Sequence, residues 1–228
     1  DYIPMGEYQI PNLTLKNENE VQLGKYGLMR RNYLQQHRPI LFTNLLTSQT
    51  LNQHLLEIEE MAKTRTHKNL PGVTLPEGII YTADLEEAMK DKNLLVMAVP
   101  SVFVRSTAQK MKPFCKEGQL IVDVAKGIEE NTLDTMTQII KEELPMADVA
   151  VLSGPSHAEE VGRGLPTTCV VGAKTKETAE YLQKMFMNET FRVYTSPDIL
   201  GIEVGGALKN VIALAAGIAD GLGYGDNT

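Results

Sequence analysis

The middle of the chain, residues 65 to about 195, alternates between strand-like and helix-like patterns. The apolar run at 94–99 is what a strand buried on both faces of a parallel sheet would show. Further strands are predicted at 78–82, 120–124, 149–152, 168–171 and 191–194, and helices between them include 133–143 and 176–187. Strands that alternate with helices of this length imply right-handed crossovers. The pattern therefore predicts an α/β fold with a mostly parallel sheet.

The two flanks are predicted to be helical. Residues 1–64 are polar, with apolar residues at helical spacing on both sides of Pro39, so we expect an N-terminal helical segment there. From about 197 to 220 the sequence is typical of one long helix with Asp198 as its N-cap. The expected organisation is thus 1–64, 65–195 and 196–228.

Composition narrows the classes of function. The net charge of −7 argues against wholesale nucleic-acid binding. We see no apolar run near the roughly 18 residues of a membrane span and no signal peptide, so we expect a cytoplasmic protein. The two cysteines have no metal-ligand spacing, and no metal site is expected. The start without Met and the abrupt last residues suggest a truncated chain.

Lys209 is the most unusual charged residue, because it lies in the largely apolar, small-residue stretch 201–214. Burial disfavours an ammonium ion, so a desolvated lysine can serve as a general base. The alternative is a side chain whose stem packs on the core while its head stays in water. On these residues alone the second interpretation is favoured.

Three candidate sites follow predicted strands, where ligands bind in open α/β sheets. They are 98–101, 125–129 and 153–160. In the last, Gly154 permits close backbone approach and Ser156 can begin a helix whose free N–H groups favour an anion. Lys126 adds positive charge. Taken singly, the Gly-Pro-Ser sequence is more often an ordinary turn, and such a lysine a solvated one.

Six motifs in series resemble those of the bacterial NAD(P)-dependent glycerol-3-phosphate dehydrogenases, over about residues 66–228. They lie at 70–76, 98–101, 126–129, 152–161, 205–211 and 219–227. The resemblance implies a Rossmann-like dinucleotide-binding domain followed by the first long helix of an all-α domain. It also implies NAD or NADP as cofactor and interconversion of sn-glycerol 3-phosphate and dihydroxyacetone phosphate by hydride transfer.

The same resemblance implies roles for individual residues. Lys209 would accept the proton of the substrate C2 hydroxyl, for which it must be neutral and therefore desolvated. The substrate contacts that it implies are Lys126, Gly154, Ser156, Lys209 and Asn210. The cofactor contacts are Pro100, Ser101, Lys126 and Ala158.

The chain also departs from that family. It has no Gly-x-Gly-x-x-Gly turn, so the Rossmann-like domain is expected to be incomplete. The residue that usually decides between NAD and NADP and an arginine that binds the substrate phosphate in that family are also missing. Residues 1–64 instead resemble small transposon-encoded proteins of the TnpV type.

Two alternatives therefore stay open. The chain could be an inactive, fused remnant of a dehydrogenase. It could also be a transposon-associated protein that binds nucleic acid through residues 1–64, where several arginines and lysines occur, although a solvated helix face explains these better. A homodimer is likewise left open.

Overall fold

The computed structural model describes residues 2–5, 8–11, 22–67 and 70–224. The chain forms two compact units, which we describe separately. The first comprises Asp1–Thr66 and Thr74–Ala83, and the second comprises His67–Val73 and Asp84–Thr228.

The first unit contains the expected helices. They are α1 (Lys25–His37), α2 (Pro39–Thr47) and α3 (Leu51–Thr64), packed around buried Leu34, Leu51 and Leu55. Pro39 begins α2, because the first turn of a helix tolerates a residue without an N–H group. A hairpin of β1 (Tyr2–Met5) and β2 (Tyr8–Pro11), antiparallel, was not predicted.

A buried carboxylate joins α1 to α3. The Gly27 amide donates a hydrogen bond of 2.7 Å to Glu59, whose other oxygen lies 3.2 Å from Lys63 Nζ. The hydrogen bond from Gly27 lowers the pKa of Glu59. Gly27 allows this approach, since a Cβ there would lie 3.2 Å from the Leu55 carbonyl oxygen.

The strand predicted at 78–82 is wrong. Gly78 belongs to a turn and residues 79–82 have no regular secondary structure. All of them belong to the first unit, and no strand of the described chain pairs with them. Ile80 is 82% exposed, so the apolar residues that suggested a strand are not buried in a sheet.

The second unit contains a five-stranded sheet in the order β3-β4-β5-β6-β7. The strands are β3 (Leu94–Met97), β4 (Leu120–Asp123), β5 (Asp148–Ser153), β6 (Thr167–Gly172) and β7 (Phe191–Ser196). All neighbours are parallel except β5 and β6, which are antiparallel. The predicted α/β class with a mostly parallel sheet is confirmed.

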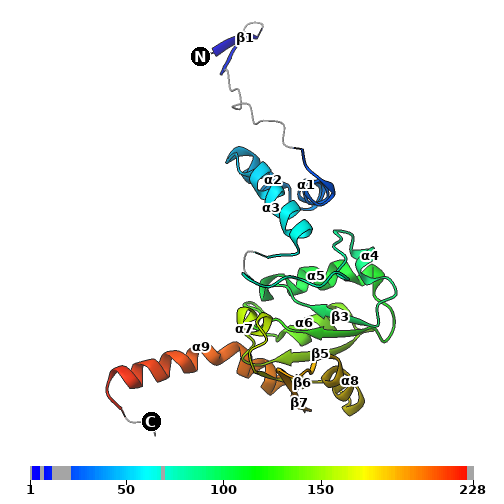
Figure 1. The fold of residues 1–228 in the computed structure, drawn as a ribbon, viewed down its shortest axis with the longest axis vertical. Coiled ribbons are helices and arrows are strands. Elements are labelled where there is room, and N and C mark those ends of the chain that lie inside the picture. Colours follow the sequence, from blue (N-terminus) through cyan, green and yellow to red (C-terminus); the bar gives the residue numbers. More distant parts are fainter. Residues whose placement is uncertain (1, 6–7, 12–21, 68–69, 225–228) are drawn as a thin grey trace. The chain divides into compact units, whose positions relative to one another are not determined.

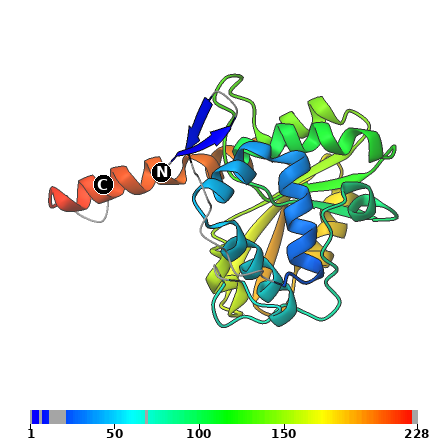
Figure 2. The same cartoon turned by 90° about the horizontal axis from the view of Figure 1, so that it is seen from above.

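Helices cover both faces of this sheet (Figures 1 and 2). On one face, Ile121 of β4 packs with α5 (Val104–Met111) and α6 (Met136–Glu143). On the other, Val122 packs with Cys169, Val171 and α8 (Lys176–Phe186). Alternate residues of β4 thus enter opposite cores, as strand geometry requires. The shorter helices are η1 (Ser101–Phe103), η2 (Lys112–Phe114), α4 (Leu85–Met89) and α7 (Ala158–Gly162).

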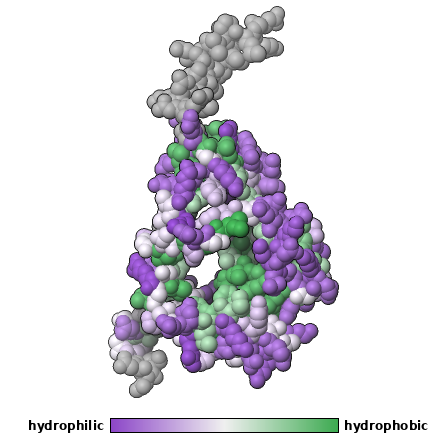
Figure 3. Space-filling model, turned by 45° about the vertical axis from the view of Figure 1, so that its right-hand side comes forward, coloured by the Kyte–Doolittle hydropathy of each residue, from purple (hydrophilic) through white to green (hydrophobic). Residues whose placement is uncertain are grey.

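The expectation that 94–99 is buried on both faces is wrong. Strand β3 is the edge of the sheet and pairs only with β4 in the described chain. Val96 is 48% exposed, whereas Met97 is buried. A groove of about 380 Å³ runs along this strand and is lined by residues that include Leu95, Val96 and Met111. Exposed apolar residues such as Val96 are therefore part of the protein surface, and Figure 3 shows hydrophobic areas of the surface next to hydrophilic ones.

Helix α9 (Ile199–Gly221) starts on the sheet and extends beyond it (Figure 1). Asp198 caps it by accepting a 2.8 Å hydrogen bond from the Gly201 amide, as predicted. Its first turn packs closely on Gly172, where a Cβ would lie 2.8 Å from Ile202. Residues 208–217 are all exposed.

The expected absence of a membrane span is not confirmed. Helix α9 is long and apolar enough to cross a membrane by length and composition, with a window of mean hydropathy 1.6 that is only 6% buried. This is weak evidence, because the core helix of a larger soluble domain has the same composition.

Candidate functional site

The candidate site lies where β4 and β5 end. Lys126, in the loop after β4, donates a 3.1 Å hydrogen bond from Nζ to Oγ of Ser156, in the loop after β5. Both side chains are half-buried. Because β4 and β5 are parallel neighbours, their carboxyl ends meet at one edge of the sheet, and residues 30 positions apart come together there.

Gly154 lets the loop after β5 pass against β6. A Cβ at this position would lie 2.7 Å from the Thr168 carbonyl oxygen and 2.9 Å from Cys169 Cα. The Gly154 carbonyl oxygen accepts a 2.9 Å hydrogen bond from the Ser156 amide. The glycine therefore sets the path that brings Ser156 to Lys126.

A second close approach joins the loops after β3 and β4. A Cβ at Gly127 would lie 2.7 Å from Ser101 Cβ and 2.8 Å from its Oγ. Ser101 begins η1, and Pro100 is its N-cap. The structure thus brings Ser101 to the loop that carries Lys126. Pro100 and Ala158 are exposed, and Ala158 is the first residue of α7.

Helix α9 reaches the same corner through Gly206. A Cβ there would lie 2.7 Å from Ser153 Oγ and 3.7 Å from Lys126 Cγ, so the helix backbone passes directly over both residues. Lys209 and Asn210 follow one turn later. Both are exposed, and Lys209 Nζ donates a 2.8 Å hydrogen bond to Asn210 Oδ1. The desolvation expected of Lys209 is absent from this structure.

A buried carboxylate that the sequence analysis missed anchors α9. Glu203, which is 6% exposed, accepts hydrogen bonds from Thr135 Oγ1 at 2.7 Å and from the Thr137 amide at 2.8 Å. Thr137 Oγ1 also donates to it. Since Thr135 caps α6 in a capping box with Gln138, Glu203 ties α9 to the amino end of α6.

A second buried carboxylate was also missed. Asp123, the last residue of β4, is fully buried, and neither of its carboxylate oxygens has a hydrogen bond in the described part of the chain. Burial, together with the nearby Glu203, raises the pKa of Asp123 to about 7, although the Ala125 amide and Lys126 act in the opposite direction. The Ala125 amide is close enough to influence the charge but does not make a well-formed hydrogen bond.

An ionic cluster supports the loop of Lys126 from outside. Arg105 of α5 binds Glu129 with two hydrogen bonds, of 2.8 and 2.7 Å, and also reaches Glu142 and Glu143 of α6. The hydrogen bonds from Arg105 hold the pKa of Glu129 at about 2. Bidentate pairing fixes geometry as well as charge, so this cluster orients the chain that follows Gly127.

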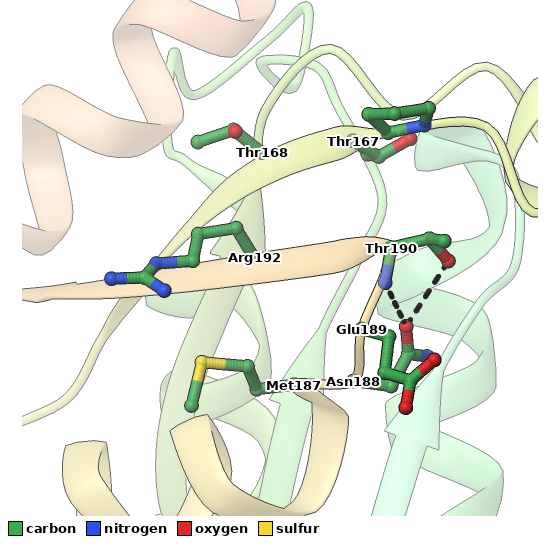
Figure 4. Close-up of a pocket in the computed structure, with 8 residues that line it drawn as sticks. Thr167, Thr168, Met187, Asn188, Glu189, Thr190 and Arg192 are labelled. Carbon is green, nitrogen blue, oxygen red and sulfur yellow. Dashed lines mark hydrogen bonds between the residues drawn. The ribbon is translucent and has the colours of Figure 1, made fainter.

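A separate pocket lies farther along the same edge of the sheet, at the beginnings of β6 and β7 (Figure 4). It has a volume of about 530 Å³, and Thr168 and Arg192 reach into it from neighbouring strands. Below them, Asn188 accepts hydrogen bonds from the backbone and side chain of Thr190. None of the residues predicted for the site lines this pocket. In the described residues there is no group of three metal-binding side chains.

The site residues were predicted unevenly. Lys126, Gly154, Ser156 and Ser101 come together, and α9 joins them through Gly206 rather than through Lys209. The missed residues carried a signal in the sequence. Asp123 ends an apolar strand, and Glu203 interrupts an apolar helix, so both were charges placed where burial was expected.

Comparison with protein families gives two matches, one after the other along the chain. Residues 41–179 match the family model for the N-terminus of NAD-dependent glycerol-3-phosphate dehydrogenase, and residues 198–228 match the model for its C-terminus. The first match includes α3 and begins well before residue 66, where the resemblance was expected to start. It leaves residues 1–40 outside.

Curated relatives and solved structures agree with these matches. The chain is 66% identical over 173 residues to glycerol-3-phosphate dehydrogenase [NAD(P)+] of Agathobacter rectalis, covering 75% of this chain and 52% of the relative. The corresponding protein of Fusobacterium nucleatum is 62% identical over 175 residues, with the same coverage. The chain thus spans about half the length of these relatives.

The structure of glycerol-3-phosphate dehydrogenase from Coxiella burnetii matches with a TM-score of 0.65 and 30% identity, over 74% of this chain and 52% of that one. The glycerol-3-phosphate dehydrogenase structure from Plasmodium falciparum matches with a TM-score of 0.66 and 27% identity. This match covers 74% of this chain and 48% of that one. These matches confirm the Rossmann-like fold and identify α9 as the beginning of an all-α domain.

Proposed function

Because the chain belongs to the family of NAD-dependent glycerol-3-phosphate dehydrogenases, we propose that it interconverts sn-glycerol 3-phosphate and dihydroxyacetone phosphate. The observation that carries this proposal is the Lys126–Ser156 hydrogen bond of 3.1 Å at the carboxyl ends of β4 and β5, with α9 packed against it at Gly206. An ammonium group and a hydroxyl at such an edge suit an anionic substrate.

Each residue at this corner has a separate task. Lys126 and Ser156 bind the substrate, and Gly154 keeps the loop backbone close to it. Lys209 accepts the C2 hydroxyl proton, and Asn210, which accepts a hydrogen bond from Lys209, orients the amine. Because Lys209 is exposed here, closure of the site over it would be needed to favour its neutral form.

The described residues fit a nicotinamide dinucleotide in part. The close contact between Gly127 and Ser101 leaves no room for a side chain, so the backbone itself forms the surface next to Lys126. Pro100, Ser101, Lys126 and Ala158 would hold the cofactor there. The sequence contains no Gly-x-Gly-x-x-Gly turn for the pyrophosphate. NAD or NADP, when bound, supplies the hydride acceptor.

The proposal is tested by following oxidation of sn-glycerol 3-phosphate by the 228-residue chain, with NAD and with NADP, as absorbance of the reduced nicotinamide. Removing a general base costs roughly 10²–10⁴ in rate. Lys209→Met should therefore lower kcat by about that factor. The control is Lys110→Met, which alters an exposed lysine on α5 and should leave the rate unchanged.

The possible results distinguish an active dehydrogenase from an inactive remnant. Turnover that Lys209→Met abolishes and Lys110→Met preserves supports the proposal. Absence of turnover in the unaltered chain, with cooperative melting intact, would show an inactive remnant. Equal rates in the two variants would remove Lys209 from its role.

The proposal also covers the location of the protein in the cell, the origin of its N-terminal segment and its oligomeric state. We place it in the cytoplasm. A TnpV-type origin was expected for residues 1–64, but the family match begins at residue 41, so the proposal retains that origin for residues 1–40 alone. We also propose a homodimer. Light scattering measures the mass of the 228-residue chain in solution, which distinguishes a monomer from a dimer. Retention of residues 1–64 on DNA that weakens with salt would favour the nucleic-acid reading instead.

A further inference from the structure

Two buried carboxyl groups, Asp123 and Glu203, lie near Lys126. Asp123 ends β4 three residues before Lys126, and Glu203 lies on α9 three residues before Gly206, which packs against Lys126. The two acids therefore approach the lysine from different elements.

Their hydrogen bonding differs. Glu203 receives three hydrogen bonds, from Thr135 and Thr137. Asp123 is fully buried, and in the described residues neither of its oxygens has a hydrogen bond. A buried carboxylate without a donor is unstable relative to the protonated acid. Asp123 therefore favours the neutral form, whereas the carboxylate oxygens of Glu203 are satisfied by hydrogen bonds.

The surroundings of Asp123 determine when it can ionise. In the sheet it lies between Met97 of β3 and Val151 of β5, both apolar. The charged groups that act on it are Glu203 from α9, which opposes its ionisation, and Lys126 from its own loop, which favours it. With burial, they bring the pKa of Asp123 to about 7, so the group is part ionised at neutral pH.

We propose that Asp123 is a positioning residue that acts through Lys126 and takes up a proton from solvent when an anion binds at the Lys126–Ser156 corner. Before binding, Lys126 is the one cation acting on Asp123 among the groups named above. An anion at that corner offsets the lysine's charge and adds its own repulsion, and protonation of an Asp123 oxygen relieves both. This rests on the proposed function, which places an anionic substrate there.

Sulfate is a suitable probe, because it does not titrate near neutral pH and carries no reacting group. Titration calorimetry of the 228-residue chain with sulfate near pH 7.3, in two buffers of different ionisation heat, measures the protons taken up. A fivefold change in affinity between the two forms of Asp123 corresponds to roughly 0.4 proton per sulfate. Affinity should accordingly fall about three- to fivefold from pH 6 to pH 8.5.

Two variants complete the experiment. Asp123→Asn should bind sulfate with no proton uptake and with affinity independent of pH. Lys126→Met should not bind it at this corner. Should Asp123→Asn fail to fold, Asp123→Ser and the unaltered chain in the two buffers still provide the measurement.

The result separates this inference from the proposed function. Binding without proton uptake by the unaltered chain, or equal uptake by Asp123→Asn, would overturn the role of Asp123 and leave the substrate corner standing. No sulfate binding at all, or binding unaffected by Lys126→Met, would overturn the anion corner and both proposals with it.

Discussion

Glu203 and Thr137 join the long helix α9 to the amino end of α6, since the Thr137 amide donates a 2.8 Å hydrogen bond to Glu203 Oε1. The residues are 66 positions apart in the chain. The contact fixes the part of α9 that leads to Gly206, and therefore the placement of α9 on the Lys126 corner.

Replacing Glu203 should destabilise the second unit. Glu203→Ala leaves the buried amide and hydroxyls of Thr135 and Thr137 without an acceptor, which costs about 2–4 kcal/mol in the free energy of unfolding. Urea denaturation measures this. Glu180→Ala, which removes an exposed partner of Lys176 3.5 Å away, should cost less than about 0.5 kcal/mol. Equal costs would show that Glu203 is not an anchor.

Asp123 should make stability depend on pH. The unfolded chain loses this proton near pH 4, whereas the native protein holds it to about pH 7. Between those values the native state binds more protons, so this group's contribution to stability falls as pH rises. Asp123→Asn should therefore be more stable than the unaltered chain at pH 8, by on the order of 3 kcal/mol. Below about pH 4 Asp123 is protonated in both states, so its ionisation no longer contributes to the difference in stability. Thermal melts across pH test this, and a constant difference would contradict it.

Two adjacent glycines of α9 provide a matched pair. Gly206→Ala places a Cβ 2.7 Å from Ser153 Oγ and should destabilise the protein by about 1–3 kcal/mol. Gly205→Ala meets nothing within 4 Å and should stabilise the helix by about 0.5–1 kcal/mol. Denaturant unfolding gives both values. If the two substitutions had the same sign, the close packing of α9 on the site would be refuted.

Arg105 should control the ionisation of Glu129. In Arg105→Met, the pKa of Glu129 should rise from about 2 toward the ordinary range near 4, because its two hydrogen bonds from the guanidinium are lost. NMR titration of the side-chain carboxyl carbons measures the change. Lys116→Met, which removes an exposed partner of Asp91, is the control and should leave Glu129 unaltered.

The sequence predicted the alternation of strands and helices well, because apolar runs such as 120–124 are typical of strands that are buried beneath helices. It failed at 78–82, where a short apolar run has no strand to pair with in the described chain. It also missed that β3 is an edge strand, since pairing depends on residues distant in the sequence.

Local motifs and a resemblance suggested Lys126 and Ser156 as candidate site residues, but not the reason why they meet. That reason lies in the parallel pairing of β4 with β5 and in two close backbone approaches, at Gly154 and Gly206. Asp123 and Glu203 escaped prediction because the burial and hydrogen bonding of a carboxylate are set by tertiary contacts.

The reversal of β6 relative to β5 has a consequence for how such a protein can change. Because the two strands are antiparallel, the whole connection from Gly154 to Pro166, α7 included, stays at the edge where Lys126 lies. Lengthening or reshaping that connection alters what the edge admits, while the register of Val151 with Gly172 and of Ser153 with Val170 stays as it is. The shape of that edge can therefore change without any repacking of the interior.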